Sequence, residues 1–168
     1  MKVITRQRNS RMCIMCGLDN PMGVNAPFYS MADGSVITLF KYRFEHQSYP
    51  GRVHGGLITS MLEELGMRAL WAKNLNESVF GVTVSLETNY RKPVPYQELL
   101  LARGEVVRET SRFFTVDAKL YAMTGELLAG GLVKYIKLDV DKIVSATSEH
   151  DEMPYLIQDN VKEIDFNA

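Results

Sequence analysis

Residues that could do chemistry are concentrated in one stretch of the chain, in which histidines and a glycine pair precede two acidic residues. His54 is followed by Gly55 and Gly56, where a helical pattern begins. Ser, Thr or Asp normally caps a helix at this position, so we expect the first backbone N–H groups to lack a side-chain partner. Such groups can bind an anion or a developing oxyanion, helped by the helix dipole. A tight turn whose amides bind water explains the two glycines equally well.

Helix geometry distinguishes the two adjacent carboxylates that follow. Glu64 and Arg68 form an (i, i+4) pair in the favourable order, which gives Glu64 a structural role. Glu63 lies about 160° from the centre of the apolar stripe and has Met67 as its (i+4) neighbour. If a second subunit covers that face, desolvation raises the pKa of Glu63 and suits it to act as a general base or nucleophile. The residues alone also allow Glu63 to be an ordinary surface glutamate.

The elements that must position these residues are one long helix and a set of strands. An apolar stripe through Leu57, Met61 and Leu65 predicts a helix over residues 55–73. Alternating patterns and the turn signals Asp33-Gly34 and Thr124-Gly125 predict strands and two hairpins. The expected strands cover residues 27–31, 36–42, 82–90, 98–108, 112–122 and 126–138, the last with a bulge or close backbone approach at Gly130-Gly131.

This order of elements predicts an α+β fold with one helix on an antiparallel sheet of about six strands. One helix leaves much of such a sheet uncovered, so we expect a second subunit to bury the rest. The folded domain is expected over residues 1–138. An acidic tail follows over residues 139–168, with one short helix around residues 155–164.

Charge and composition exclude several classes of protein. The chain has 168 residues, of which 46% are hydrophobic and 23% charged, as in ordinary soluble domains. No apolar run is long enough to span a membrane, and the N-terminus lacks the apolar stretch of a signal peptide. The tail carries eight acidic and two basic residues, while residues 1–138 carry a net charge of +5. That body suits an anionic small ligand but is too weakly clustered for nucleic acid, and we expect a cytoplasmic location.

Cys13 and Cys16 form the Cys-x-x-Cys-Gly sequence that opens the chain's turn-rich entry segment. Zinc fingers need a second ligand pair at a characteristic spacing, and none follows here. The segment also lacks the strand–helix setting of a redox motif. The pattern therefore favours two reduced thiols and no metal, although a metal site shared across a dimer is an alternative.

The run from Val53 to Glu63 resembles the signature of hotdog-fold acyl-CoA thioesterases of the phenylacetate (PaaI-like) type. That signature is His-Gly-Gly, an apolar helix, and an acidic residue nine positions after the histidine. The resemblance extends from about Cys13 to Leu138 and includes Tyr90-Arg91-Lys92-Pro93-Val94. It implies a hotdog fold, in which a curved antiparallel sheet wraps a central helix and subunits pair. It also implies hydrolysis of an acyl-CoA thioester to the free acid and CoA, without a cofactor.

The resemblance implies a role for each residue of the signature. The N–H of Gly55 would polarise the thioester carbonyl, with Gly56 supporting the turn and His54 orienting the loop. Glu63 would activate water or attack the carbonyl, in a pocket built with the neighbouring subunit. Thr83 stands where the family often has a Ser or Thr that positions the water.

The chain departs from the family at two positions. Many members have an Asn six residues before the histidine, where this chain has Ser48, so Gln47 or His46 is a candidate substitute. The acid is also Glu rather than the commoner Asp, which adds one methylene to its reach. Further candidate substrate contacts are Arg91, Lys92 and Arg52 for the CoA phosphates and Met67 for the acyl chain.

Two other functions are compatible with the same fold. In a hydroxyacyl or enoyl thioester (de)hydratase, His46 and Glu63 would form an acid–base pair, but such enzymes have a shorter spacing than the 17 residues here. A non-catalytic acyl-CoA-binding module is the other alternative, since Ser48 replaces a family Asn and fold does not fix function. The expected partners are acyl-CoA and further copies of the chain, as a dimer or a dimer of dimers. The sequence leaves the acyl-chain length open.

Overall fold

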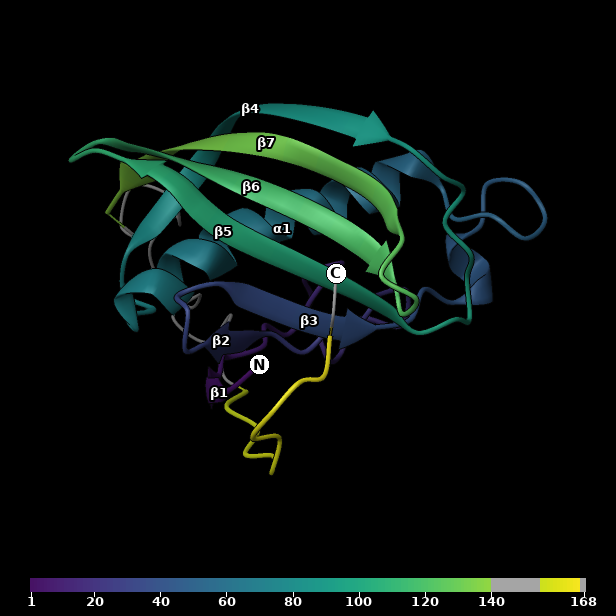
Figure 1. The fold of residues 1–168 in the computed structure, drawn as a ribbon, viewed down its shortest axis with the longest axis horizontal. Helices are drawn as coiled ribbons and strands as arrows, with labels where there is room; N and C mark the ends of the chain where they lie inside the picture. The colour runs from purple at the N-terminus through teal and green to yellow at the C-terminus, as the bar shows by residue number, and fades with distance from the viewer. Residues whose placement is uncertain (140–154, 167–168) are drawn as a thin grey trace.

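A computed structural model describes residues 1–139 and 155–166, and it confirms the expected hotdog architecture. One curved antiparallel sheet wraps a single long helix (Figure 1). Within the described residues the sheet has seven strands, one more than expected, in the order β1-β2-β3-β5-β6-β7-β4. The elements are β1 Val3–Arg6, β2 Tyr29–Met31, β3 Val36–Phe40, the 3-10 helix η1 Phe44–His46, α1 Gly55–Asn74, β4 Phe80–Tyr90, β5 Leu100–Glu109, β6 Phe113–Ala122 and β7 Leu127–Leu138.

Helix α1 fills the concave side of the sheet, as its apolar stripe predicts (Figure 1). Met61 and Leu65 are completely buried, and Leu57 is half-buried at the start of the helix. Gly66 allows the closest contact with the sheet, because a Cβ there would lie 2.1 Å from the ring of Tyr135 on β7. The helix therefore has one fixed position along β7. None of the described helices is long and apolar enough to cross a membrane.

Strand β4 forms one edge of the described sheet, where β7 is its one partner. Its register shifts between Thr83 and Ser85, so Val84 is an extra residue without a partner on β7. The sequence predicted that side chains would alternate regularly between the two faces of this strand, and the bulge contradicts that prediction at Val84. Val82 and Val84 are 42% and 53% exposed, whereas Thr83 faces the helix. A period-two pattern cannot reveal such a reversal.

The glycine pair expected to mark a bulge or a close approach proves to be a close approach. A Cβ on Gly131 would lie 2.2 Å from the carbonyl oxygen of Glu87 on β4. Both predicted hairpin turns are confirmed, with Gly34 and Gly125 at positive φ angles of 82° and 87°.

The prediction of a helix at residues 155–164 was wrong. This segment is extended and forms isolated bridges to Lys2 and Asn9, beside strand β1, which sequence analysis missed. Its one fully apolar anchor, Ile164, is buried with Tyr29, Ile37 and Leu101. This anchor, the backbone bridges, and the contacts of Asp159 with Arg6 and Tyr29 hold an extended segment without any amphipathic period. Residues 140–154 and 167–168 of the acidic tail lie outside the described residues.

Candidate functional site

A row of four helix residues, spaced four apart, forms the face of α1 that lies against β4. Gly55, Thr59, Glu63 and Met67 share this face because residues four apart are neighbours on a helix. Strand β4 runs along the row in the opposite direction. Each residue of the row contacts one residue of β4. In order from Gly55 to Met67, these contacts are Tyr90, Thr88, Thr83 and Gly81.

Glu63 lies under β4 as a half-buried carboxylate with one side-chain partner, Thr83, whose hydroxyl donates to Glu63 Oε1. Burial raises the pKa of Glu63, and the negative charge of Glu64 adds to the rise, while the Thr83 hydrogen bond opposes it. The Tyr135 hydroxyl donates to the Glu63 backbone carbonyl. Glu63 is thus a fixed carboxylate that takes up a proton more readily than an exposed glutamate.

Glu64 has the structural role that the helix geometry predicts. Its Oε1 accepts from Arg68 Nε at 2.9 Å, which confirms the (i, i+4) pair. Arg68 is 1% exposed, donates to the carbonyl of Arg8, and stacks over the Phe28 ring at 4.6 Å. The two carboxylates therefore differ in environment, and Glu63 alone of the pair lacks a cationic partner among the described residues.

The helix start differs from the expectation in one respect, because a side chain does cap it. His54 Nδ1 accepts a hydrogen bond from the Gly56 N–H at 3.0 Å, and the His54 carbonyl accepts from Leu57 and Ile58. Among the described residues, no group accepts from the Gly55 N–H. The cap thus satisfies the neighbouring amide and leaves Gly55 as the donor available to a ligand.

Tyr90, a residue that sequence reasoning did not select as functional, holds the Gly55 peptide in place. Its hydroxyl donates to the Gly55 carbonyl at 3.0 Å and lies 2.5 Å from Thr59 Oγ1. Thr59 Oγ1 lies 3.4 Å from Thr88 Oγ1. The sequence signal was available, since Thr88 and Tyr90 are polar residues on the inward face of β4. Their partner on the helix could not be read from spacing.

The loop before the helix is fixed by the buried side chain of His46. Its Nδ1 accepts from the Arg43 N–H at 3.0 Å, and its Nε2 contacts the Met22 carbonyl at 2.8 Å. Nε2 therefore carries the proton and donates. Both ring nitrogens are engaged with backbone, and the residue is 2% exposed. This leaves no free nitrogen for the acid–base role that a dehydratase requires of His46.

The two candidate substitutes for the family Asn occupy different positions in this loop. Gln47 is half-buried and bridges to Val53, whereas Ser48 is exposed and donates its N–H to the Arg52 carbonyl at 2.8 Å. Ser48 lines a cavity of about 360 Å³ that also contains Gly55. The other lining residues are Tyr49, Arg52, Val53, Ile58, Tyr90, Arg91, Lys92, Pro93 and Val94.

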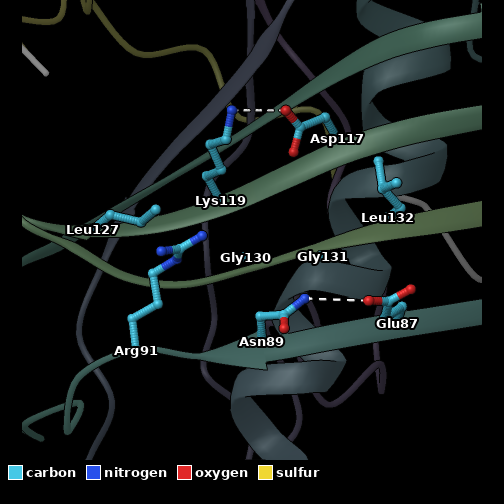
Figure 2. A pocket seen from close by; sticks show the side chains of 9 residues that line it. All are labelled: Glu87, Asn89, Arg91, Asp117, Lys119, Leu127, Gly130, Gly131 and Leu132. Carbon is cyan, nitrogen blue, oxygen red and sulfur yellow. Dashed lines mark hydrogen bonds and ion pairs between the residues drawn. The ribbon is translucent and has the colours of Figure 1, made fainter.

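Two of the candidate phosphate contacts, Arg91 and Lys92, directly follow the end of β4 and line the hollow that contains Gly55. Lys92 is exposed and lies 3.5 Å from Glu126. Arg91 also lines a second hollow, of about 170 Å³, on the outer face of the sheet beside Lys119 and Asp117. Figure 2 shows its side chain directed over β7 toward that hollow, with the helix behind the strands. Arg91 therefore stands between the two hollows.

Gly55 and Glu63 share a helix face but not a contact. Eight residues at 1.5 Å rise separate them by about 12 Å along the axis. A thioester carbon accepts an attack at about 3 Å while its oxygen is bound at a similar distance. Within one chain the two groups cannot act on the same carbonyl.

Comparisons with known proteins identify the family of the chain. Residues 50–129 match the model of the thioesterase superfamily. Human acyl-coenzyme A thioesterase 13 is 31% identical over 104 residues, which cover 61% of this chain and 72% of that protein. Rat acyl-coenzyme A thioesterase THEM4 is 28% identical over 119 residues, or 70% of this chain. The matched part spans about half, 49%, of the THEM4 protein.

A solved structure shows the same fold. The crystal structure of protein RHA08564, a thioesterase superfamily protein, superposes with a TM-score of 0.67 at 23% identity. The match covers 75% of this chain and 60% of that one.

Proposed function

The chain belongs to the thioesterase superfamily, and we propose that it hydrolyses an acyl-coenzyme A thioester to the free acid and coenzyme A. One observation carries this proposal. The helix combines an unpartnered amide at Gly55 with a half-buried carboxylate at Glu63, whose pKa is raised. The names of the relatives supply the substrate class, and their identity of about 30% extends it to this chain.

The Gly55 N–H polarises the thioester carbonyl. This N–H lies at the N-terminus of α1, which is the positive end of the helix dipole. It donates to the carbonyl oxygen as negative charge develops on that oxygen. Tyr90 binds the carbonyl of the same residue and so holds the first turn of the helix against β4. The cavity beside Gly55 leads toward Arg52 and Lys92, whose charges suit the phosphates of coenzyme A.

Glu63 removes a proton from the attacking water, or attacks the carbonyl itself. The base must be ionised, and burial keeps its pKa closer to neutral than that of an exposed glutamate. Thr83 donates to one carboxylate oxygen and leaves the other for the water. A carboxylate and a backbone amide suffice for thioester hydrolysis, so the proposal includes no metal or redox cofactor.

Because about 12 Å separates Gly55 from Glu63 along one helix, the proposed site combines Gly55 of one chain with Glu63 of a second copy. Strand β4 offers the surface for that copy, since its outer edge is unpaired in the described sheet and exposes Val82 and Val84. An antiparallel pairing of two β4 strands makes the two helices antiparallel. The Gly55 end of each helix then points toward Glu63 of the other.

Hydrolysis is tested with a panel of acyl-CoA thioesters and a thiol-trapping reagent, on wild type and on Glu63→Gln. Glutamine keeps the size of the side chain and can accept from Thr83, but it cannot take a proton. We expect activity to fall by about 10²–10⁴-fold. Glu87→Gln, on the exposed face of β4, is the matched control and should keep wild-type activity. Full activity in Glu63→Gln contradicts the proposed role of this residue.

A further inference from the structure

The two cysteines meet a helix carboxylate at a place that the proposed hydrolysis does not use. The Cys13 and Cys16 sulfurs and a Glu64 oxygen all lie within 4.8 Å of one another. We propose that these three side chains bind one zinc ion. The proposal is independent of the proposed hydrolysis, because none of the three residues takes part in it.

The turn that carries the cysteines presents both sulfurs on one side. The N–H groups of Met15 and Cys16 point to Cys13 Sγ, with donor–acceptor distances of 3.3 and 3.4 Å. Ser10 Oγ lies 3.2 Å from Cys16 Sγ. Gly17 closes the turn, since a Cβ there would lie 2.4 Å from the Cys13 carbonyl oxygen. The neighbouring Cys16 sulfur and burial raise the pKa of the Cys13 thiol, so an ion that binds there would displace its proton.

Glu64 already has the geometry of a third ligand. Its Oε1 is held by Arg68, which leaves Oε2 facing Cys13 Sγ at 3.5 Å. With Zn–S and Zn–O bonds of ordinary length at a tetrahedral angle, the sulfur and oxygen of two ligands lie about 3.5 Å apart. At metal sites a second residue usually hydrogen-bonds to a ligand and fixes its orientation, and buried Arg68 does this for Glu64.

Charge at the cluster also fits a divalent cation. Two thiolates and one carboxylate carry three negative charges, which the ion and the Arg68 guanidinium balance. Thiolate sulfur selects zinc over magnesium or calcium. Zinc sites with three protein ligands keep a fourth position for water, and the partial exposure of Cys13 and Glu64 gives water and the ion access.

This site cannot be recognised from the sequence, because its third ligand is 51 residues from Cys13. The spacing that identifies zinc fingers requires a second Cys or His pair nearby. Here the fold supplies a helix carboxylate instead. A bound ion would fix the N-terminal turn to α1 one residue from Glu63.

The test uses the full chain, reduced and freed of metal by a chelator, and titrated with Co²⁺ and then Zn²⁺. We expect one equivalent of Co²⁺ to produce a thiolate-to-cobalt charge-transfer band, which Zn²⁺ then abolishes. Cys13→Ser and Cys16→Ser should each weaken binding by at least tenfold. Met12→Ser, an exposed sulfur-containing residue in the same segment, is the matched control and should bind like wild type. Absence of the band in reduced wild type, or wild-type affinity in either cysteine variant, overturns the proposal.

A second measurement needs no variant, so it stands even if the serine variants fail to fold. The chain has two cysteines, so mass spectrometry can follow the alkylation of each thiol separately. Zn²⁺ should slow the alkylation of both Cys13 and Cys16 at least tenfold, and Mg²⁺ should not. Equal alkylation rates with and without Zn²⁺ would mean that the thiols hold no zinc.

Discussion

The N–H of Gly55 is the group on which the proposed polarisation of the carbonyl depends, and proline can remove it without ending the helix. Proline is favoured at the first helical position, and His54 has the extended backbone, with φ −63° and ψ 131°, that a following proline requires. We therefore expect Gly55→Pro to lower kcat for acyl-CoA hydrolysis by about 10²–10³-fold.

Gly55→Ala is the control for this substitution, because it keeps the N–H. Its Cβ would lie 3.4 Å from the Tyr90 hydroxyl, which is an ordinary contact. Helix content by circular dichroism should match wild type in both variants. Equal rates for the proline and alanine variants would show that this amide does not bind the carbonyl oxygen.

In the proposed mechanism, Thr83 lowers the pH at which Glu63 becomes a base. Its hydrogen bond favours the ionised carboxylate and so lowers a pKa that burial raises. Activity is lost as the pH falls through this pKa, so the acidic limb of kcat/KM should lie above the ordinary glutamate value of 4.5. Thr83→Ala removes the donor and should move that limb up by about one pH unit. Thr83→Ser keeps the hydroxyl and should leave the limb near its wild-type position, whereas a downward shift in Thr83→Ala would contradict this role.

At the scale of elements, α1 and β7 are held in register by the contact between Gly66 and Tyr135. Tyr135 cannot move away cheaply, because it is 1% exposed and stacks on Phe114 with ring centroids 4.8 Å apart. Gly66→Ala should therefore lower the free energy of unfolding by about 1–3 kcal/mol, although alanine is the better helix former. Denaturant titration measures the loss.

A double-mutant cycle isolates the steric cause of that loss. Tyr135→Leu removes the ring atoms that an added Cβ would meet. The double variant Gly66→Ala/Tyr135→Leu should then lose less stability than the two single variants together. Strict additivity would indicate that the cost of Gly66→Ala arises elsewhere.

The elements with strong local signals could be predicted from the sequence. The helix was expected over residues 55–73 and is found at Gly55–Asn74, and the hairpins at Gly34 and Gly125 were expected from their turn residues. Strand β1 was missed because its pairing with β2 is a long-range contact that four residues do not encode. The expected helix at residues 155–164 failed for the same reason, since its neighbours lie at the other end of the chain.

The same distinction applies to the candidate site, where residues with a local signal were predicted and a residue that depends on a long-range contact was missed. Gly55 and Glu63 were selected from local signals, because Gly55 opens the helix and Glu63 lies nine residues after His54, as in the family signature. Tyr90 was missed because its role depends on which helix residue its hydroxyl meets. The predicted absence of a cap also failed, since His54 is an uncommon cap whose ring nitrogen replaces the usual oxygen.

At the scale of the whole molecule, the proposed pairing of two chains can be tested by mixing two inactive variants. Glu63→Gln chains keep Gly55, and Gly55→Pro chains keep Glu63. A mixed dimer therefore contains one site in which both groups are intact. After joint refolding at equal amounts, random pairing should restore about a quarter of wild-type activity. No recovery, with mixed dimers detected by native mass spectrometry, would mean that each site is built within one chain.

Because of the bulge at Val84, the contacts of the candidate site depend on the length of β4 and not only on its composition. The strand turns over at that residue, so Thr83 can meet Glu63 while Leu86 and Thr88 still face the helix. Deleting Val84 would leave every named functional residue in the chain and yet rotate one half of the strand by half a turn. Natural insertions and deletions should therefore be far rarer within β4 than in the loop after it, and an engineer who shortens this strand would remove the base's partner without mutating it.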